Sequence, residues 1–291
     1  MKLLLTIVGL LCAVRVAEAK GSPATAAAKT LLDAQVAAIT AHDAKAFAAT
    51  FDEPAYAVFP TTLEARASAK IAIAAKTWLD GLGKTQVVLD HPRFGDLEFT
   101  GCAWISAELV ATGDTTVRWR VTELVAPLQA GVEKPTAADF RVLAAMISEP
   151  MDDKASLTAT LPALPEVHND HDPATEVAGV RILFDLQVLD DPAVTFVGSA
   201  PKELKVGKAA VAAMVKSFKG LDMKALTLDY AGDMNSMNTA TAEFEHVQVT
   251  YKVGGKAIVV PYRVMLIVAS PGTGGHGVGK LGVAHFSIAQ R

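Results

Sequence analysis

The sequence predicts an α+β protein with two tandem cone-shaped domains, each a strongly curved antiparallel sheet wrapped around N-terminal helices. Three observations lead to this prediction. Apolar residues recur first at helical spacing and then at every second position, and the whole order returns roughly 140 residues later. A strand that alternates apolar and polar residues has one face to bury, so each sheet is expected to curve around its own helices.

The first copy begins with two helical patterns. The apolar residues of KTLLDAQVAAITAHDAKAFAATF (29–51) fall at helical spacing, and a second helix is predicted from the stripe of Ile71, Ala74, Ala75 and Trp78. The period then changes to two. Four strands are predicted, in TQVVLDHPRF, CAWISAELVAT, TTVRWRVTELVA and FRVLAAMISEP.

The second copy repeats this order. Its helix carries the same apolar stripe at Val211, Met214, Val215 and Phe218. Four strands are again predicted, in MKALTLDYAG, TATAEFEHVQVTYKV, KAIVVPYRVMLIVA and KLGVAHFSIA. The helix that should open this copy, around 178–189, has a weaker pattern than its counterpart in the first copy.

Two polar positions recur between the copies. Arg120 and Arg263 each follow an aromatic residue in matching strands, and Ser148 corresponds to Ser287. A recurring arginine beside an aromatic residue suits an interface or a structural role as readily as it suits chemistry.

The first residues predict a secretory signal that is cleaved after Ala19. MKLLLTIVGLLCAVRVAEA has one early positive charge, an apolar run too short for a permanent membrane anchor, and an A-x-A ending. We therefore expect an exported protein, periplasmic or secreted, with no membrane association after cleavage. The expected organisation is a signal peptide over 1–19, a first domain over 24–150, a linker over 151–172, and a second domain with a shortened first helix over 173–291.

Several segments share a pattern with a known fold family. They are HDAKAFAATFDEPAYAVFP, AWISAEL, the strand pair RVTEL and RVMLIV, and the endings AAMISEP and VAHFSIA. In these segments the chain resembles the nuclear-transport-factor-2-like (NTF2-like) superfamily, in particular its SnoaL-like branch of small exported bacterial proteins. The resemblance implies a cone whose mouth, between sheet and helices, holds a small hydrophobic ligand. Superfamily members include ketosteroid isomerase, scytalone dehydratase and polyketide cyclases, while others serve only in binding or dimerisation, so fold does not decide function.

The enzymes of this superfamily place a carboxylate or a histidine inside an apolar cavity, where burial tunes its pKa. The candidate catalytic residues here are His91, Glu108, Glu123 and His285. The candidate ligand-binding residues are Tyr56, Trp104, Trp119, Arg120, Tyr262 and Arg263.

The direction of Arg120 is left open by the sequence. Alternation puts Arg118, Arg120 and Thr122 on one face of their strand and Trp119 on the other. If the tryptophan faces the helices, the arginines lie on the open face of the sheet; in the reverse arrangement Arg120 lines the cavity. For His285, we favour a structural histidine hydrogen-bonded within its sheet over a general base.

Other chemistries find little support. No nucleotide-binding glycine motif follows a strand, no cofactor is expected, and charges that sum to −4 without clustering disfavour nucleic acid. The run HNDHD (168–172) holds the densest set of metal-ligand side chains, but Pro173 follows it as the first residue of a predicted helix, so we interpret the run as a domain boundary. No metal site is therefore expected, with the pair His168 and His171 as the alternative.

Two functional classes remain. The first is a non-catalytic module for binding a small hydrophobic ligand or for assembly, built as an intramolecular pseudo-dimer that is monomeric or forms a homodimer. The second is an isomerase, dehydratase or cyclase that acts on a small hydrophobic molecule in the cone of one domain. The only cysteine after the predicted signal, Cys102, lies in an apolar run and is expected to be a buried thiol and not a nucleophile.

Overall fold

A computed structural model of the chain describes residues 21–60, 64–83, 85–97, 100–113, 115–129, 135–151, 186–218, 221–234, 238–253, 255–271 and 279–288. Within these residues, no helix has both the length and the apolar character needed to cross a membrane.

The first half of the chain has helices at its start and strands after them. Its elements are α1 (Pro23–Thr40), α2 (Ala44–Ala48), β1 (Phe51–Val58), β2 (Glu64–Arg66), α3 (Ser68–Asp80), β3 (Gln86–Leu97), β4 (Cys102–Thr112), β5 (Thr116–Pro127), the 3₁₀ helix η1 (Ala137–Asp139) and β6 (Phe140–Ser148).

Local sequence explains where the first two helices begin. Ser22 caps α1, because its hydroxyl accepts a hydrogen bond from the Thr25 backbone N–H, and Pro23 follows at the first helical position. Asp43 caps α2 in the same way through the N–H of Ala46. The break between the two helices therefore falls at the His42-Asp43 step.

The first sheet has the strand order β2-β1-β6-β5-β4-β3. Strands β3 to β6 form an antiparallel meander, but β1 runs parallel to β6. The prediction of an all-antiparallel sheet was therefore wrong at this strand. A parallel neighbour needs a long crossover connection, and here α3 and the four strands β2 to β5 provide it.

The second half repeats this topology. Its elements are β7 (Gln187–Val188), β8 (Thr195–Val197), β9 (Leu204–Val206), α6 (Lys208–Phe218), β10 (Asp222–Met234), β11 (Asn238–Val253), β12 (Lys256–Pro271) and β13 (Lys280–Ile288). The order β10-β11-β12-β13-β8-β9 matches the first sheet strand for strand, with β8 parallel to β13, and β7 adds to β13.

The registers of the two sheets confirm the residue correspondences. Arg120 lies opposite Ser148 in the first sheet, and Arg263 lies opposite Ser287 in the second. Together with the repeated element order, this confirms the predicted tandem α+β architecture. The predicted opening helix of the second copy falls mostly on residues that the structure does not describe.

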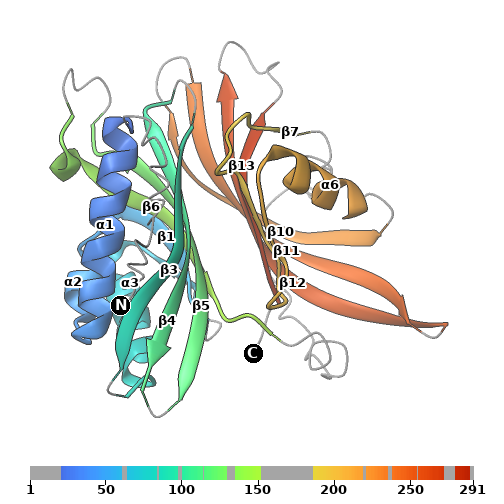
Figure 1. Ribbon diagram of the computed structural model, residues 1–291, viewed down its shortest axis with the longest axis horizontal. Coiled ribbons are helices and arrows are strands. Elements are labelled where there is room, and N and C mark those ends of the chain that lie inside the picture. Colours follow the sequence, from blue (N-terminus) through green and yellow to red (C-terminus); the bar gives the residue numbers. More distant parts are fainter. Residues whose placement is uncertain are drawn as a thin grey trace, which may run out of the picture.

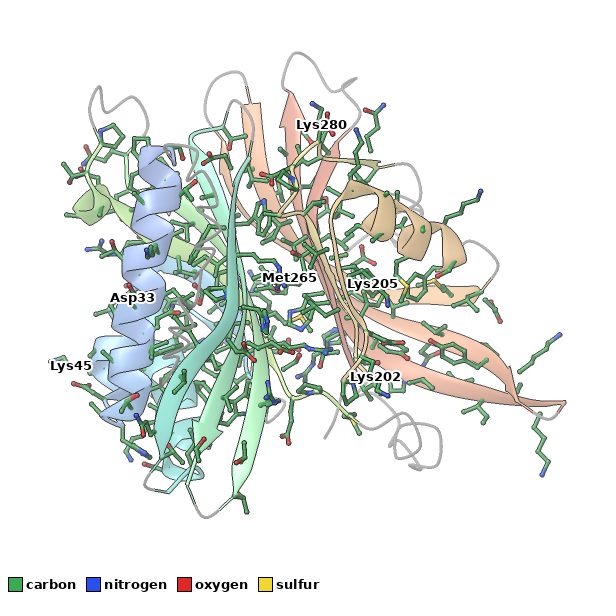
Figure 2. The ribbon with its side chains drawn as sticks, in the orientation of Figure 1. Asp33, Lys45, Lys202, Lys205, Met265 and Lys280 are labelled. Atoms are coloured by element: carbon green, nitrogen blue, oxygen red, sulfur yellow. The ribbon has the colours of Figure 1, made fainter. Side chains whose placement is uncertain are left out.

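The two sheets lie face to face, with the helices on the outer sides (Figure 1). One apolar cluster fills the space between the first sheet and helices α1 to α3, and another lies between the second sheet and α6. A third cluster joins side chains of both sheets, including Leu124 and Met146 from the first and Met265 and Val283 from the second. Met265 is seen between the sheets in Figure 2.

Trp104 of β4 belongs to this shared cluster. Its indole ring covers Gly95 of β3, where a Cβ atom would come within 2.3 Å of the ring. The same ring approaches Gly282 of β13 in the second sheet, where a Cβ atom would lie 3.0 Å from it. Two glycines thus make room for one large side chain at the contact between the sheets.

Replacing Gly95 with alanine is expected to lower the free energy of unfolding by about 1–3 kcal/mol, because the added methyl group overlaps the Trp104 ring. Urea denaturation of the full chain measures this change. In a Trp104→Leu background the ring is gone, so the same substitution should cost less. An equal cost in both backgrounds would contradict the packing argument.

Candidate functional site

The alternation of β5 decides which way its side chains point. Trp119 faces the helices, where its ring makes an edge-to-face contact with Trp78 of α3 at 5.2 Å between ring centroids. Arg120 and Thr122 therefore face the second sheet. The sequence left two orientations of Arg120 open. In the structure Arg120 lies on the sheet face away from the helices, and the second sheet covers that face.

Arg120 is almost completely buried between the sheets, with 1% of its surface exposed. Its Nε donates to Glu108 Oε1 at 3.1 Å within the first sheet. Its two terminal nitrogens donate to the carbonyl oxygens of Gly198, Ala200 and Pro201, at 2.6, 2.8 and 2.8 Å. These carbonyls belong to the turn between β8 and β9, so the arginine fastens that turn of the second half to the first sheet.

Arg263 makes the matching contact in the opposite direction. It lies on β12 of the second sheet and forms an ion pair with Glu64 of β2, with 3.1 Å between Nε and Oε1. His246, beside Arg263 on β11, is 2.9 Å from the same carboxylate oxygen. The other oxygen accepts a hydrogen bond from the Tyr56 hydroxyl at 2.6 Å.

Glu64 is consequently a firmly ionised group. Burial raises its pKa, but the hydrogen bonds from His246 and Tyr56 and the charge of Arg263 outweigh burial and lower the pKa to about 2. Phe244 closes this cluster on the apolar side, with its ring 4.4 Å from that of Tyr56. Sequence reasoning selected Tyr56 and Arg263 but missed Glu64 and His246, because their meeting depends on how the sheets face each other.

His285 lies at the centre of the contact, on β13. Its Nε2 is hydrogen-bonded to Ser148 Oγ at 2.7 Å and its Nδ1 to Thr122 Oγ1 at 3.0 Å. The sequence predicted a histidine hydrogen-bonded within its own sheet, but both partners belong to the first sheet, so that part of the prediction was wrong. Complete burial and the nearby Arg120 charge lower its pKa to about 3.

Glu123 points the other way, into the packed cluster beneath α1. It is fully buried, and neither carboxyl oxygen makes a hydrogen bond. Burial raises its pKa to about 8, and the nearby Gln35 amide opposes this shift only in part. Gln35 in turn donates to the Thr50 hydroxyl at 3.1 Å.

The second half holds two buried carboxyls on the corresponding face. Glu243 of β11 lies opposite Leu266 of β12, and this pair matches Ile105 and Glu123 in the first half. Each cone therefore buries one carboxyl group in this cross-strand pair. The group is carried by β5 in the first cone and by β11 in the second.

Glu245 follows Glu243 on the same face of β11. Burial raises the pKa of Glu243 to about 7, and burial together with the Glu243 charge raises that of Glu245 to about 8. Sequence reasoning overlooked this pair. The sequence did indicate this burial, because both glutamates alternate in step with Val247 and Val249, which are buried in the second cone.

The predicted catalytic residues His91 and Glu108 meet at the rim of the first sheet. His91 has a positive φ of 48° at a bulge in β3, and its Nδ1 lies 2.5 Å from Asp90. The ligand atoms of these three residues lie within 4.8 Å of one another. Arg118 pairs with both carboxylates, at 3.1 Å from Asp90 and 3.7 Å from Glu108, and Arg120 also pairs with Glu108, so two arginines balance the two carboxylates. His285 lies elsewhere, in the buried contact.

The predicted ligand-binding residues do not form one site. Tyr56, Trp104, Arg120 and Arg263 lie in the contact between the sheets, and Trp119 lies beneath α3. Tyr262 lies in the second cone, with its hydroxyl 3.1 Å from that of Tyr251. His168 and His171 lie outside the described residues. Cys102 is buried as predicted.

A hollow of about 290 Å³ opens at the start of α1. It lies where β3 ends and β4 and β6 begin. Its lining residues are Ser22, Pro23, Ala24, Asp96, Leu97, Gly101, Cys102, Pro135 and Phe140. None of the predicted catalytic residues is among them.

Comparison with known proteins yields likeness in structure only. No family model and no curated protein matches the sequence. An NTF2-like protein of unknown function from Pseudomonas putida KT2440 is 15% identical, with a TM-score of 0.37 over 49% of this chain and 96% of its own. An uncharacterised protein with a cystatin-like fold from Caulobacter vibrioides is 18% identical, with a TM-score of 0.37 over 45% of this chain and 92% of its own.

A third solved structure, a putative calcium/calmodulin-dependent protein kinase type II association domain from Thiobacillus denitrificans, is 14% identical. Its TM-score is 0.34 over 42% of this chain and 94% of its own. Identities and scores of this size carry no inference about what this chain binds.

Replacing Arg120 with alanine is expected to lower the free energy of unfolding by about 3–5 kcal/mol, because Glu108 and three carbonyl oxygens lose their donor inside the contact. Arg118→Ala is the matched control on the same strand. Its side chain is 53% exposed, so less than about 1 kcal/mol should be lost. Equal losses in urea denaturation would refute the assignment.

The buried carboxyls predict that stability falls as pH rises from about 6.5 to about 8. In this window the folded protein keeps protons on Glu123 and Glu245 that the unfolded chain has released, so rising pH favours unfolding. His285 opposes this trend only below its unfolded pKa of about 6.5. Urea denaturation at several pH values should show a shallower slope for Glu123→Gln and an unchanged slope for the exposed control Glu149→Gln.

Proposed function

We propose that this chain is an exported, non-catalytic module for a small hydrophobic ligand, built as an intramolecular pseudo-dimer. The observation that carries the proposal is the reciprocal pair of arginine contacts. Arg120 of the first sheet holds the β8–β9 turn of the second half, and Arg263 of the second sheet holds β2 of the first half.

This reciprocity supports the two-fold relation of a pseudo-dimer. In a symmetric dimer, one patch meets the same patch of the partner, so each contact occurs twice in opposite directions. The strands β2 and β9 occupy equivalent places in the two sheets, and the arginines occupy equivalent places on β5 and β12. Here a single chain supplies both sides.

The polar groups between the sheets support a structural role for this contact. Arg120, Arg263 and His285 all have partners supplied by the protein itself. A general base needs access to a substrate and a pKa near the working pH. His285 has neither, because it is fully buried with a pKa of about 3.

A second candidate function is supported by Glu123. A buried carboxyl with a pKa of about 8, inside the first cone, resembles the tuned acid or base of an isomerase, dehydratase or cyclase. Apolar side chains pack around it, however, and it does not line the hollow at α1. The first proposal is therefore preferred.

Export is supported by the residues at 1–19, whose charge, apolar run and A-x-A ending fit a cleaved secretory signal. The proposed domain organisation follows the sequence: a first domain over 24–150, a linker over 151–172 and a second domain over 173–291.

Native mass spectrometry of the protein purified from its own cells tests the proposal. A single chain lacking residues 1–19 is expected, carrying a small apolar molecule, because the sheet faces that related chains would use for pairing are already covered. A mass of two chains at low micromolar concentration would overturn the pseudo-dimer. Turnover of the retained molecule that is lost in Glu123→Gln would establish the enzyme instead.

A further inference from the structure

We infer that the hollow at the start of α1 binds a compact apolar molecule that presents a hydrogen-bond donor or a positive charge to Asp96, and that it rejects anions. This inference rests on the proposed ligand-binding function and adds to it a location and a chemical class.

The walls of the hollow are mainly apolar and come from separate parts of the fold. Ala24 and Phe140 belong to the cluster beneath α1, and Leu97 and Cys102 belong to the cluster between the sheets. A volume of about 290 Å³ lies just below the 300–1,000 Å³ typical of small-molecule sites. A ligand of about one ring fits this space, and burying its apolar surface would supply the affinity.

Asp96 is the one ionisable carboxylate among the described lining residues. Its Oδ1 accepts hydrogen bonds from the hydroxyls of Ser22 and Thr25, the latter at 2.6 Å. These bonds fix the orientation of the carboxylate at the edge of the hollow. Among the described residues both hydrogen bonds to this carboxylate go to Oδ1, so Oδ2 is left for a ligand.

The start of α1 offers few donors to an anion, because most of them are already used. Pro23 has no N–H, the Thr25 N–H bonds to Ser22 Oγ at 3.1 Å, and the Ala26 N–H bonds to the Ser22 carbonyl at 3.0 Å. Both side-chain hydroxyls donate to Asp96. An anion would therefore meet a negative charge and few free donors, whereas a cation or a neutral donor meets an acceptor.

Binding of three probes with the same ring tests the inference directly. They are cyclohexylmethylamine, cyclohexylmethanol and cyclohexanecarboxylate, which differ in charge at pH 7. Shifts of the Gly101 and Cys102 backbone amide signals in NMR spectra of the full chain report occupancy of the hollow. The amine is expected to bind at least about fivefold more tightly than the carboxylate, because attraction to Asp96 becomes repulsion when the charge is reversed.

Asp96→Asn should reduce that preference to less than about twofold, while its amide oxygen still accepts from the hydroxyls. Asp90→Asn, on the same strand but outside the hollow, is the matched control and should leave the preference unchanged. Carboxylate binding equal to amine binding in the wild-type protein, or a preference that survives in Asp96→Asn, overturns the inference while leaving ligand binding intact. Failure of all three probes to bind would instead count against the proposed function.

Discussion

The burial of the Arg120 guanidinium between two sheets is the constraint on which their contact depends. Removing a charge from water costs several kcal/mol unless hydrogen bonds replace the lost hydration. One carboxylate and three carbonyl oxygens replace it here, and the carbonyls come from the turn between β8 and β9. That turn must therefore lie against the first sheet whenever the arginine is buried. Apolar groups such as Trp104 and Met265 then fill the surrounding space.

The two copies have kept this arrangement while diverging in chemistry. Arg120 is buried and bonds to the Glu108 carboxylate and three carbonyl oxygens, whereas Arg263 pairs with Glu64 at a more exposed edge, beside a histidine and a tyrosine. At the centre, His285 forms hydrogen bonds to the other sheet. Its counterpart in the first copy is Met146. Met146 lies opposite Thr122 in the first sheet, just as His285 lies opposite Met265 in the second. Because the two copies have separate sequences within one chain, each can differ at such a position without changing the other.

The concave faces of the cones accommodate ionisable side chains in a different way. They bury carboxyl oxygens that make no hydrogen bond, and such carboxyl groups keep their protons near neutral pH because ionisation in an apolar environment is unfavourable. Glu123 and Glu243 occupy equivalent cross-strand positions, although they come from different strands. The ionisable groups Arg120, Arg263 and Glu64 in the sheet contact are thus paired, while the buried carboxyls in the cones are neutralised. These are the two ways a protein interior accommodates ionisable side chains.

The sequence by itself determined the repeat, the change from helical to alternating spacing, the matching of Arg120 to Arg263, and the burial of Cys102. These features are local, because side-chain periodicity depends only on helix and strand geometry. Only the tertiary structure decided that β1 runs parallel to β6, that Arg120 faces the other sheet, and that His285 bonds across it. Alternation tells which residues share a face but not what covers that face, so every partner drawn from the opposite sheet depends on how the two sheets pack.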